Sequence, residues 1–244
     1  MLSKLTILLE RNKNVSYNSS SLMQGVLMEH ISPEYANILH NGKMNPYSQH
    51  LVFREDEICW EILTTTGEAR ENIIMPMLMN TESEFKVNHL DIALKVKQKE
   101  LKDTSMEELM EKTYFGTCKP YLTLDFITPA AFKVDGRYQF YPSIFHIFQS
   151  LVKKYDAVSG EAEIFSEELM KEIQEHLFVA GYNLRSTNFS LEGVKIPAFR
   201  GQLALRSHGP QMFTNLIHML VNFGTFSGVG IKTAMGMGAL SIKE

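Results

Sequence analysis

Four glycines near the end of the chain have the clearest chemical meaning. They form two GxG pairs with five residues between them: Gly228, Gly230, Gly236 and Gly238. Glycine permits positive φ angles and lets backbone N–H groups come close to an anion. Lys232 and Thr233 lie between the pairs and supply a charge and a hydroxyl group. We therefore predict a phosphate-binding segment; the alternative is a turn that only lets a helix and a strand pack.

Basic residues are concentrated in the same quarter of the chain. The net charge is −4 over 244 residues. Residues 183–244, however, hold six basic and two acidic residues, so this segment carries +4 and the remainder −8. Such a segment can attract a polyanion locally. Arg200 and Arg206 have even spacing in a predicted strand, so both are expected on one face, where they would contact phosphate unless that face is merely solvated.

The elements that must position these residues follow from hydrophobic periodicity. Leu5, Ile7 and Leu9 alternate with polar residues, which indicates a strand. Helical spacing follows at 22–27, a hairpin is predicted at 47–65, a helix at 68–79, and a further strand at 90–96. This order of strand, helix, hairpin, helix and strand is the ferredoxin-like pattern.

The pattern recurs in the second half of the chain. The predicted elements are a strand at 121–126, a helix at 142–155, extended segments at 182–189 and 195–206, a helix at 210–223 and a strand at 237–242. We predict an α+β protein with two tandem ferredoxin-like (RRM-like) domains, residues 1–118 and 119–244. A single larger α+β domain is the alternative.

The segment from Phe199 to Leu240 closely resembles the C-terminus of the CRISPR repeat-processing endoribonucleases of the repeat-associated RNA-binding superfamily. The signature of that family is GhGxxxxxGhG, where h is hydrophobic, and the chain matches every fixed position. The stretches FYPSIFHIFQSLVKKYD and LHNGKMNPYSQHLVF resemble the family as well. The resemblance thus spans nearly the whole chain.

This resemblance implies an enzyme that binds CRISPR repeat RNA and cuts the precursor transcript without a metal ion or other cofactor. The ribose 2′-OH attacks the neighbouring phosphorus, leaving a 2′,3′-cyclic phosphate and a 5′-OH. Such a reaction needs a base, an acid and cations that stabilise the phosphorane. Histidine suits either proton-transfer role because it titrates near neutral pH.

Among eight histidines, His40 is the catalytic candidate. In the family the acid or base histidine follows the first helices, and His40 follows a helix that should begin at Ser32-Pro33 and end near Gly42, with glycine in the left-handed conformation. The C-terminal end of a helix favours a positively charged side chain, and a histidine that acts as a general acid must be positively charged. Lys43 is the candidate for phosphate stabilisation.

The chain departs from the family at the tyrosine that many members carry on the first helix. Residues 21–30 contain no tyrosine, and the nearest are Tyr35 and Tyr47. Neither lies at the family's spacing. The resemblance therefore supports His40 as the catalytic histidine of this chain. It does not supply the tyrosine that would complete a three-residue site with a histidine and a lysine.

Composition limits the remaining possibilities. Cys59 and Cys118 lie in unrelated contexts, which predicts neither a disulfide nor a metal site and favours a reducing cytoplasm. No apolar run reaches the roughly 20 residues of a membrane span, and the N-terminus lacks the features of a signal peptide. We expect a cytoplasmic monomer or homodimer whose partners are repeat RNA and a CRISPR effector complex. The alternative function is a non-catalytic RNA-binding subunit of a CRISPR effector complex.

Overall fold

The computed structural model describes residues 1–160 and 163–243, and the chain folds into two compact units. The first unit comprises Met1–Thr104 together with Lys232–Gly236. The second unit comprises Ser105–Ile231 and Met237–Glu244. The centre of the glycine-rich segment therefore belongs to the first unit, although the chain on both sides of it belongs to the second.

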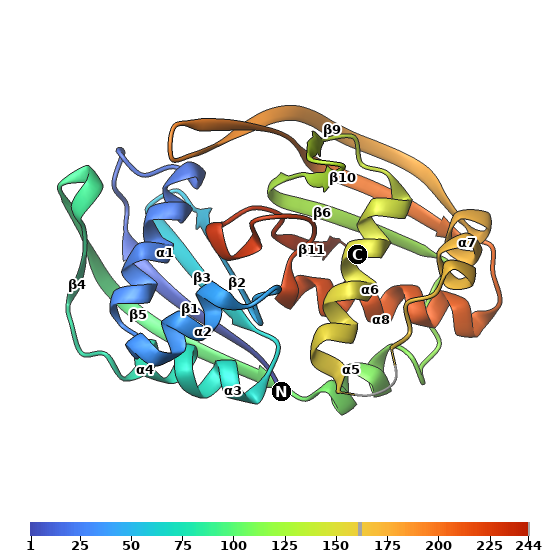
Figure 1. Cartoon of the computed structure of the whole chain (residues 1–244), viewed down its shortest axis with the longest axis horizontal. Coiled ribbons are helices and arrows are strands. Elements are labelled where there is room, and N and C mark those ends of the chain that lie inside the picture. Colours follow the sequence, from blue (N-terminus) through green and yellow to red (C-terminus); the bar gives the residue numbers. More distant parts are fainter. Residues whose placement is uncertain (161–162, 244) are drawn as a thin grey trace. The chain divides into compact units, whose positions relative to one another are not determined.

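The first unit contains a five-stranded antiparallel sheet with the order β2-β3-β1-β5-β4 (Figure 1). Its strands are β1 (Leu2–Glu10), β2 (Tyr47–Phe53), β3 (Glu57–Thr64), β4 (Glu84–Val87) and β5 (Ile92–Thr104). Its helices are α1 (Ser20–Glu29), α2 (Pro33–Asn41), and α3 (Gly67–Ala69) and α4 (Met75–Met79), which are joined by the π-helical turn η2 (Arg70–Ile74). Without β4, this order is that of a ferredoxin-like sheet.

The second unit repeats the same strand order in its sheet, β11-β6-β10-β9. These strands are β6 (Tyr121–Ala130), β9 (Leu177–Leu191), β10 (Val194–Ser207) and β11 (Leu240–Lys243), and a separate hairpin contains β7 (Phe132–Val134) and β8 (Arg137–Gln139). The helices are α5 (Met106–Lys112), α6 (Ile144–Ser159), α7 (Glu167–His176) and α8 (Gln211–Ser227). The prediction of two tandem ferredoxin-like domains is confirmed.

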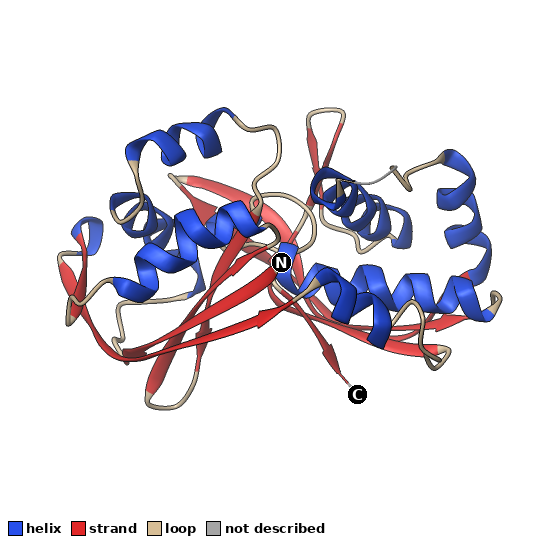
Figure 2. Ribbon diagram, turned by 90° about the horizontal axis from the view of Figure 1, so that it is seen from below, coloured by secondary structure: helices blue, strands red, loops and turns tan. Residues whose placement is uncertain are grey.

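In each unit the main helices pack on one face of that unit's own sheet (Figure 2). In the first unit, Leu5, Ile7 and Leu9 alternate into a core shared with α1, as the sequence predicts. Burial of such side chains supplies most of the stability of an amphipathic helix. No helix among the described residues combines the length and apolar character that crossing a membrane requires.

Several boundaries differ from the predicted ones. The strand predicted at 90–96 continues to Thr104, and β4 pairs with its first half. The short strands β4, β7 and β8 were not predicted, because three or four residues show no measurable alternation. The β9–β10 hairpin turns at Glu192 (φ 49°) and Gly193 (φ 81°), the left-handed pair of a two-residue turn.

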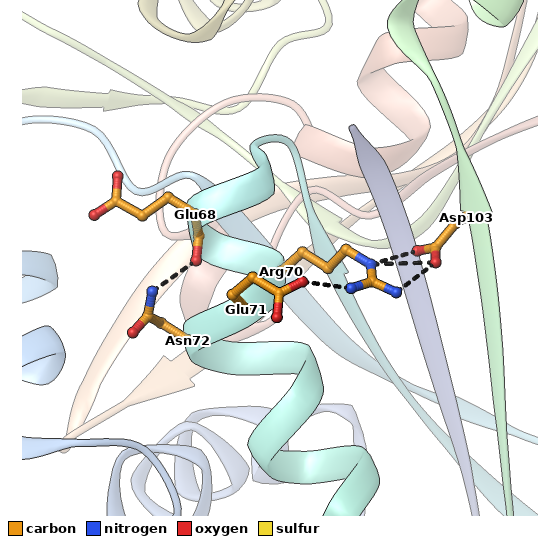
Figure 3. Close-up of polar contacts among 5 residues, drawn as sticks. All are labelled: Glu68, Arg70, Glu71, Asn72 and Asp103. Carbon is orange, nitrogen blue, oxygen red and sulfur yellow. Dashed lines mark hydrogen bonds and ion pairs between the residues drawn. The ribbon is translucent and has the colours of Figure 1, made fainter.

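Arg70 attaches the helical segment of residues 67–79 to the end of β5 (Figure 3). Its Nε donates to both carboxylate oxygens of Asp103 at 3.1 Å, and one terminal nitrogen donates to Asp103 Oδ2 at 2.8 Å. The other terminal nitrogen lies 2.6 Å from Glu71. The hydrogen bonds from Arg70 hold the pKa of Asp103 below its usual value.

Glu61 forms a partly buried charge cluster on the face of the first sheet opposite α1. Its carboxylate lies 2.7 Å from Lys4 Nζ and 3.3 Å from Nε2 of His50, which is directly opposite in the strand register. Burial alone would raise the pKa of Glu61, but His50 and Lys4 outweigh burial and lower the pKa to about 2. Ionised Glu61 therefore stabilises the folded state.

We predict that Glu61→Gln lowers the free energy of unfolding by roughly 2–3 kcal/mol at pH 7. Because the folded pKa lies below the unfolded one, this contribution is complete above about pH 5 and declines as pH falls toward 2. Urea unfolding at several pH values measures the difference from wild type, and more than half of it should be lost by about pH 3. Glu100→Gln, in an exposed pair with Lys102, is the control. A difference equal at pH 7 and pH 3 would contradict the assignment.

Candidate active site

His40 lies in the last turn of α2 with its side chain exposed. The helix begins as the sequence predicts: the Ser32 hydroxyl accepts the Tyr35 N–H at 3.2 Å, and Pro33 takes the first position. Buried Tyr35 and Leu39 anchor the helix, which leaves His40 on its solvent side. The expectation for Gly42 was wrong, because its φ of −68° is extended and not left-handed.

A hollow of about 370 Å³ lies beside His40, within the first unit. Gln24 from α1, Asn45, and Tyr47 at the start of β2 contribute its polar groups, and Ala234 and Met235 of the glycine-rich segment form part of its wall. The hollow therefore brings together residues almost 200 positions apart in sequence. It presents an exposed titratable group beside several hydrogen-bonding side chains.

Tyr47 reaches this hollow from a strand, whereas Tyr35 is not among the residues that line it. Tyr47 is almost fully buried, and burial raises its pKa although a hydrogen bond with Gln24 opposes the shift. Burial, followed by the charge of Glu68, raises the pKa of Tyr35 to about 12. Both phenols are thus protonated at neutral pH. Spacing along the chain gave no reason to choose Tyr47, because β2 rather than the first helix places it.

Lys43 lies in the exposed loop between α2 and β2 and does not line the hollow. Its position three residues after His40 leaves its ammonium group in solvent. Lys43 is thus close to His40 in the sequence, but it does not contribute to the hollow.

The four glycine N–H groups donate to acceptors within the protein. Their partners are the Gly224 carbonyl at 2.9 Å, the Ser150 hydroxyl at 2.8 Å, the Thr233 carbonyl at 3.3 Å and the Pro129 carbonyl at 2.9 Å, for Gly228, Gly230, Gly236 and Gly238 respectively. These donors are therefore occupied in the folded chain. The glycine N–H groups are not available to bind an anion in this structure.

Close approach explains why two of these positions are glycine. At Gly236 (φ 102°) a Cβ atom would overlap the Cβ of Ser20 at the start of α1. At Gly238 (φ 66°) a Cβ would overlap the carbonyl oxygen of Val229. Both positions combine left-handed backbone with contact distances that exclude a side chain.

Helix α6 holds the first GxG pair in the second unit. The Ser150 hydroxyl accepts the Gly230 N–H, and Lys154 Nζ donates to the carbonyls of Ser227 and Gly228 at 3.0 Å each. Lys154 is partly buried there, and loss of solvent around its ammonium group lowers its pKa to about 7. Sequence patterns could not identify this role of Lys154, because a lysine on an amphipathic helix is normally part of its solvent-exposed face.

Lys232 is the exposed residue at the centre of the segment. It has a left-handed backbone conformation (φ 56°, ψ 32°) and immediately precedes the 3-10 turn η4 (Thr233–Met235), in which Thr233 is buried. A residue other than glycine is uncommon in this conformation. Such conformations concentrate at functional positions, where the surrounding structure maintains them.

Arg200 and Arg206 both lie on β10, but the β6–β10 register shifts between Phe199 and Gly201, and Gly201 has a φ of 121°, so regular alternation is interrupted between the two arginines. The guanidinium of Arg206 lies 5.2 Å from the ring centroid of Tyr121. Arg185, which sequence analysis did not select, is directly opposite Arg200 in the β9–β10 register, and both line a hollow of about 340 Å³. Arg185 and Arg200 are distant in sequence, so only the strand register shows that they lie opposite each other.

The described residues contain no group of three or more His, Cys, Asp or Glu side chains arranged to hold a metal ion. Cys59 and Cys118 are both free thiols. The hollow itself is lined by one titratable imidazole, His40, and by the polar side chains of Gln24, Asn45 and Tyr47.

Comparison with known proteins assigns the chain to a family. A family model described as CRISPR-associated endoribonuclease Cas6 matches residues 124–240. The CRISPR-associated endoribonuclease Cas6 of Streptococcus thermophilus is 28% identical over 243 residues, which cover 100% of this chain and 99% of that protein. Its counterpart in Mycobacterium tuberculosis is 32% identical over 248 residues, covering 99% of this chain and 78% of that protein.

Solved structures share the fold over the whole chain. A product complex of Cas6 (TTHB231), a Thermus thermophilus protein, has a TM-score of 0.82 at 22% identity and is covered completely. A product complex of Cas6 (TTHA0078) has a TM-score of 0.81 at 18% identity, again with full coverage of both chains. With the tandem ferredoxin-like units and the full-length sequence match, these comparisons lead to one assignment: the chain belongs to the CRISPR-associated endoribonuclease Cas6 family.

Proposed function

We propose that this chain binds the repeat of a precursor CRISPR transcript and cuts it at one phosphodiester, with the 2′-OH as nucleophile. The observation that carries the proposal is the exposed His40 at a hollow whose wall includes the glycine-rich segment of the family. The family assignment supports endoribonuclease activity. The sequence resemblance supports the finer mechanism, which leaves a 2′,3′-cyclic phosphate and a 5′-OH.

In this proposal His40 acts as the general acid. The 2′-OH gives its proton to a solvent water or hydroxide, the 2′-oxygen forms a bond to phosphorus, and the bond from phosphorus to the 5′-oxygen breaks. The 5′-oxygen takes the proton that His40 donates. His40 lies in the last turn of α2 and lines the hollow. The neighbouring groups of Gln24, Asn45 and Tyr47 can orient the nucleotide by hydrogen bonding.

Cations outside the hollow would position the RNA backbone. We assign Lys43 and Lys232 to phosphate contacts near the cut, because both are exposed. Arg200 and Arg206, together with Arg185, would contact phosphates along the second sheet. The four glycines, Gly228, Gly230, Gly236 and Gly238, shape the RNA-binding segment, with buried Thr233 inside it. Phosphate contacts of this kind set the position of the RNA and do not read its sequence.

We predict that His40→Ala slows single-turnover cleavage of repeat RNA by about 10²–10⁴-fold, because a general acid contributes that much. Repeat affinity should stay within a few-fold of wild type. Asn37→Ala, an exposed change on the same helix, is the matched control and should leave the rate unchanged. Cleavage by His40→Ala at the wild-type rate would refute the catalytic role; undetectable cleavage by the wild-type chain would favour an RNA-binding subunit instead.

A second prediction concerns the nucleophile. A repeat RNA with a single 2′-deoxyribose on the 5′ side of the cut should bind normally and remain uncut, because the attacking oxygen is missing. The unmodified RNA should be cut in the presence of EDTA, and end-group analysis should find a 2′,3′-cyclic phosphate. Cutting of the deoxy substrate, or loss of activity in EDTA with recovery in magnesium, would exclude this mechanism.

A third prediction concerns binding. Lys232→Ala and Arg206→Ala should each weaken repeat RNA binding and lower the slope of log affinity against log salt by about one unit, because each removes one phosphate contact. Thermal stability should change little, since both side chains are exposed. Lys171→Ala, an equal loss of charge on α7, should leave affinity and slope unchanged. If both variants match this control, neither residue contacts the RNA.

A further inference from the structure

Gln49 is a polar side chain in an apolar environment. It lies in the middle of β2, faces the helices between Tyr47 and Leu51, and is 1% exposed. Burial of an amide costs free energy unless each of its polar atoms finds a partner. Its presence in this core therefore requires an explanation other than packing.

All polar atoms of the Gln49 side chain have partners. Its amide nitrogen donates to the carbonyl oxygens of Ser20 at 2.7 Å and Ala234 at 3.0 Å. Its amide oxygen accepts the indole N–H of Trp60 at 2.9 Å. One side chain thus connects β2, the start of α1, the glycine-rich segment and β3, all within the first unit.

These bonds fix the part of the glycine-rich segment that faces His40. Ala234 accepts from Gln49, and Ala234 and Met235 form part of the wall of the hollow that His40 and Tyr47 also line. The segment also touches α1, where Gly236 lies against Ser20 so closely that no Cβ fits. The position of the segment is therefore set by this close contact and by the buried hydrogen bond from Gln49.

We infer that Gln49 is a positioning residue for RNA cleavage: by holding Ala234, it keeps the segment Lys232–Gly236 in place beside His40. The inference rests on the proposed function of the His40 hollow. Gln49 does not contact the reacting atoms, since it is buried. It acts through the wall that Ala234 and Met235 form, and through the position of Lys232. A misplacement of about 1 Å at such a site can cost about 10²-fold in rate.

The test compares Gln49→Met with Trp60→Phe. Methionine keeps the size of the side chain but loses both donors, whereas Trp60→Phe removes one bond to Gln49 and leaves both bonds to the carbonyls. With enzyme in saturating excess over repeat RNA, Gln49→Met should cut about 10–100-fold more slowly. Trp60→Phe should stay within about threefold of wild type. Equal slowing in both variants would overturn the inference, because general damage to the core would then explain it.

Hydrogen exchange supplies a readout that does not depend on activity. The amides of Met235 and Gly236 donate within the segment, to Lys232 and Thr233. They should exchange faster in Gln49→Met but not in Trp60→Phe, while amides of β1 and β3 stay unchanged. Slower cutting without faster exchange of the segment would overturn a positioning role.

His40→Ala, assayed in parallel, separates failure of this inference from failure of the proposed function. If His40→Ala is slow and Gln49→Met cuts at the wild-type rate, only the positioning role fails. If His40→Ala also cuts at the wild-type rate, the catalytic role proposed for His40 fails, and unchanged exchange in Gln49→Met would still overturn the role of Gln49 in holding the segment. Should Gln49→Met not fold, Gly236→Ala displaces the same segment from the side of α1. Wild-type cutting by that variant would overturn the inference.

Discussion

The hydrogen bond from the buried Gln49 amide to the Ala234 carbonyl is the interaction on which the site depends most. A main-chain carbonyl inside an apolar core needs a partner, and Ala234 belongs to the core of the first unit. The chain returns there after more than 120 residues spent in the second unit. The hollow beside His40 includes this returning segment in its wall. A site made in this way requires both the first helices and the C-terminal segment.

The glycine-rich segment illustrates how packing constrains a functional loop. Gly236 and Gly238 are positions where a Cβ would overlap a neighbouring atom, and the four glycine N–H groups are already donated. The glycines therefore give the segment its shape, and Lys232 presents its charge from a backbone conformation that few residues other than glycine adopt. Ser150 and Lys154 secure the first GxG pair within the second unit.

Much of the fold could be predicted from sequence because alternation and helical spacing are strong in the long elements. The hairpin predicted at 47–65 matches β2 and β3, and both sheets contain the strand order of a ferredoxin-like fold. The short strands β4, β7 and β8 were not predicted, because three or four residues are too few to show an alternation of apolar and polar side chains. The end of β5 was missed because its second half is charged and largely exposed.

The site was less predictable, because it depends on contacts between distant residues. His40 could be selected from the family resemblance and its place at a helix end, and the structure puts it at a hollow. Tyr47 was set aside on spacing, since only the path of β2 brings it there. A signal for Gln49 was present, because a polar residue stands between Tyr47 and Leu51 in a buried strand pattern. Its partner at Ala234 lies 185 residues away, beyond any local pattern.

In the proposed mechanism, His40 donates the proton to the departing 5′-oxygen. A repeat RNA with sulfur in place of that oxygen has a leaving group that needs no general acid. On this substrate, His40→Ala should cut within about tenfold of wild type, whereas on the natural RNA it should be about 10²–10⁴-fold slower. An equal deficit on both substrates would show that His40 does not supply this proton.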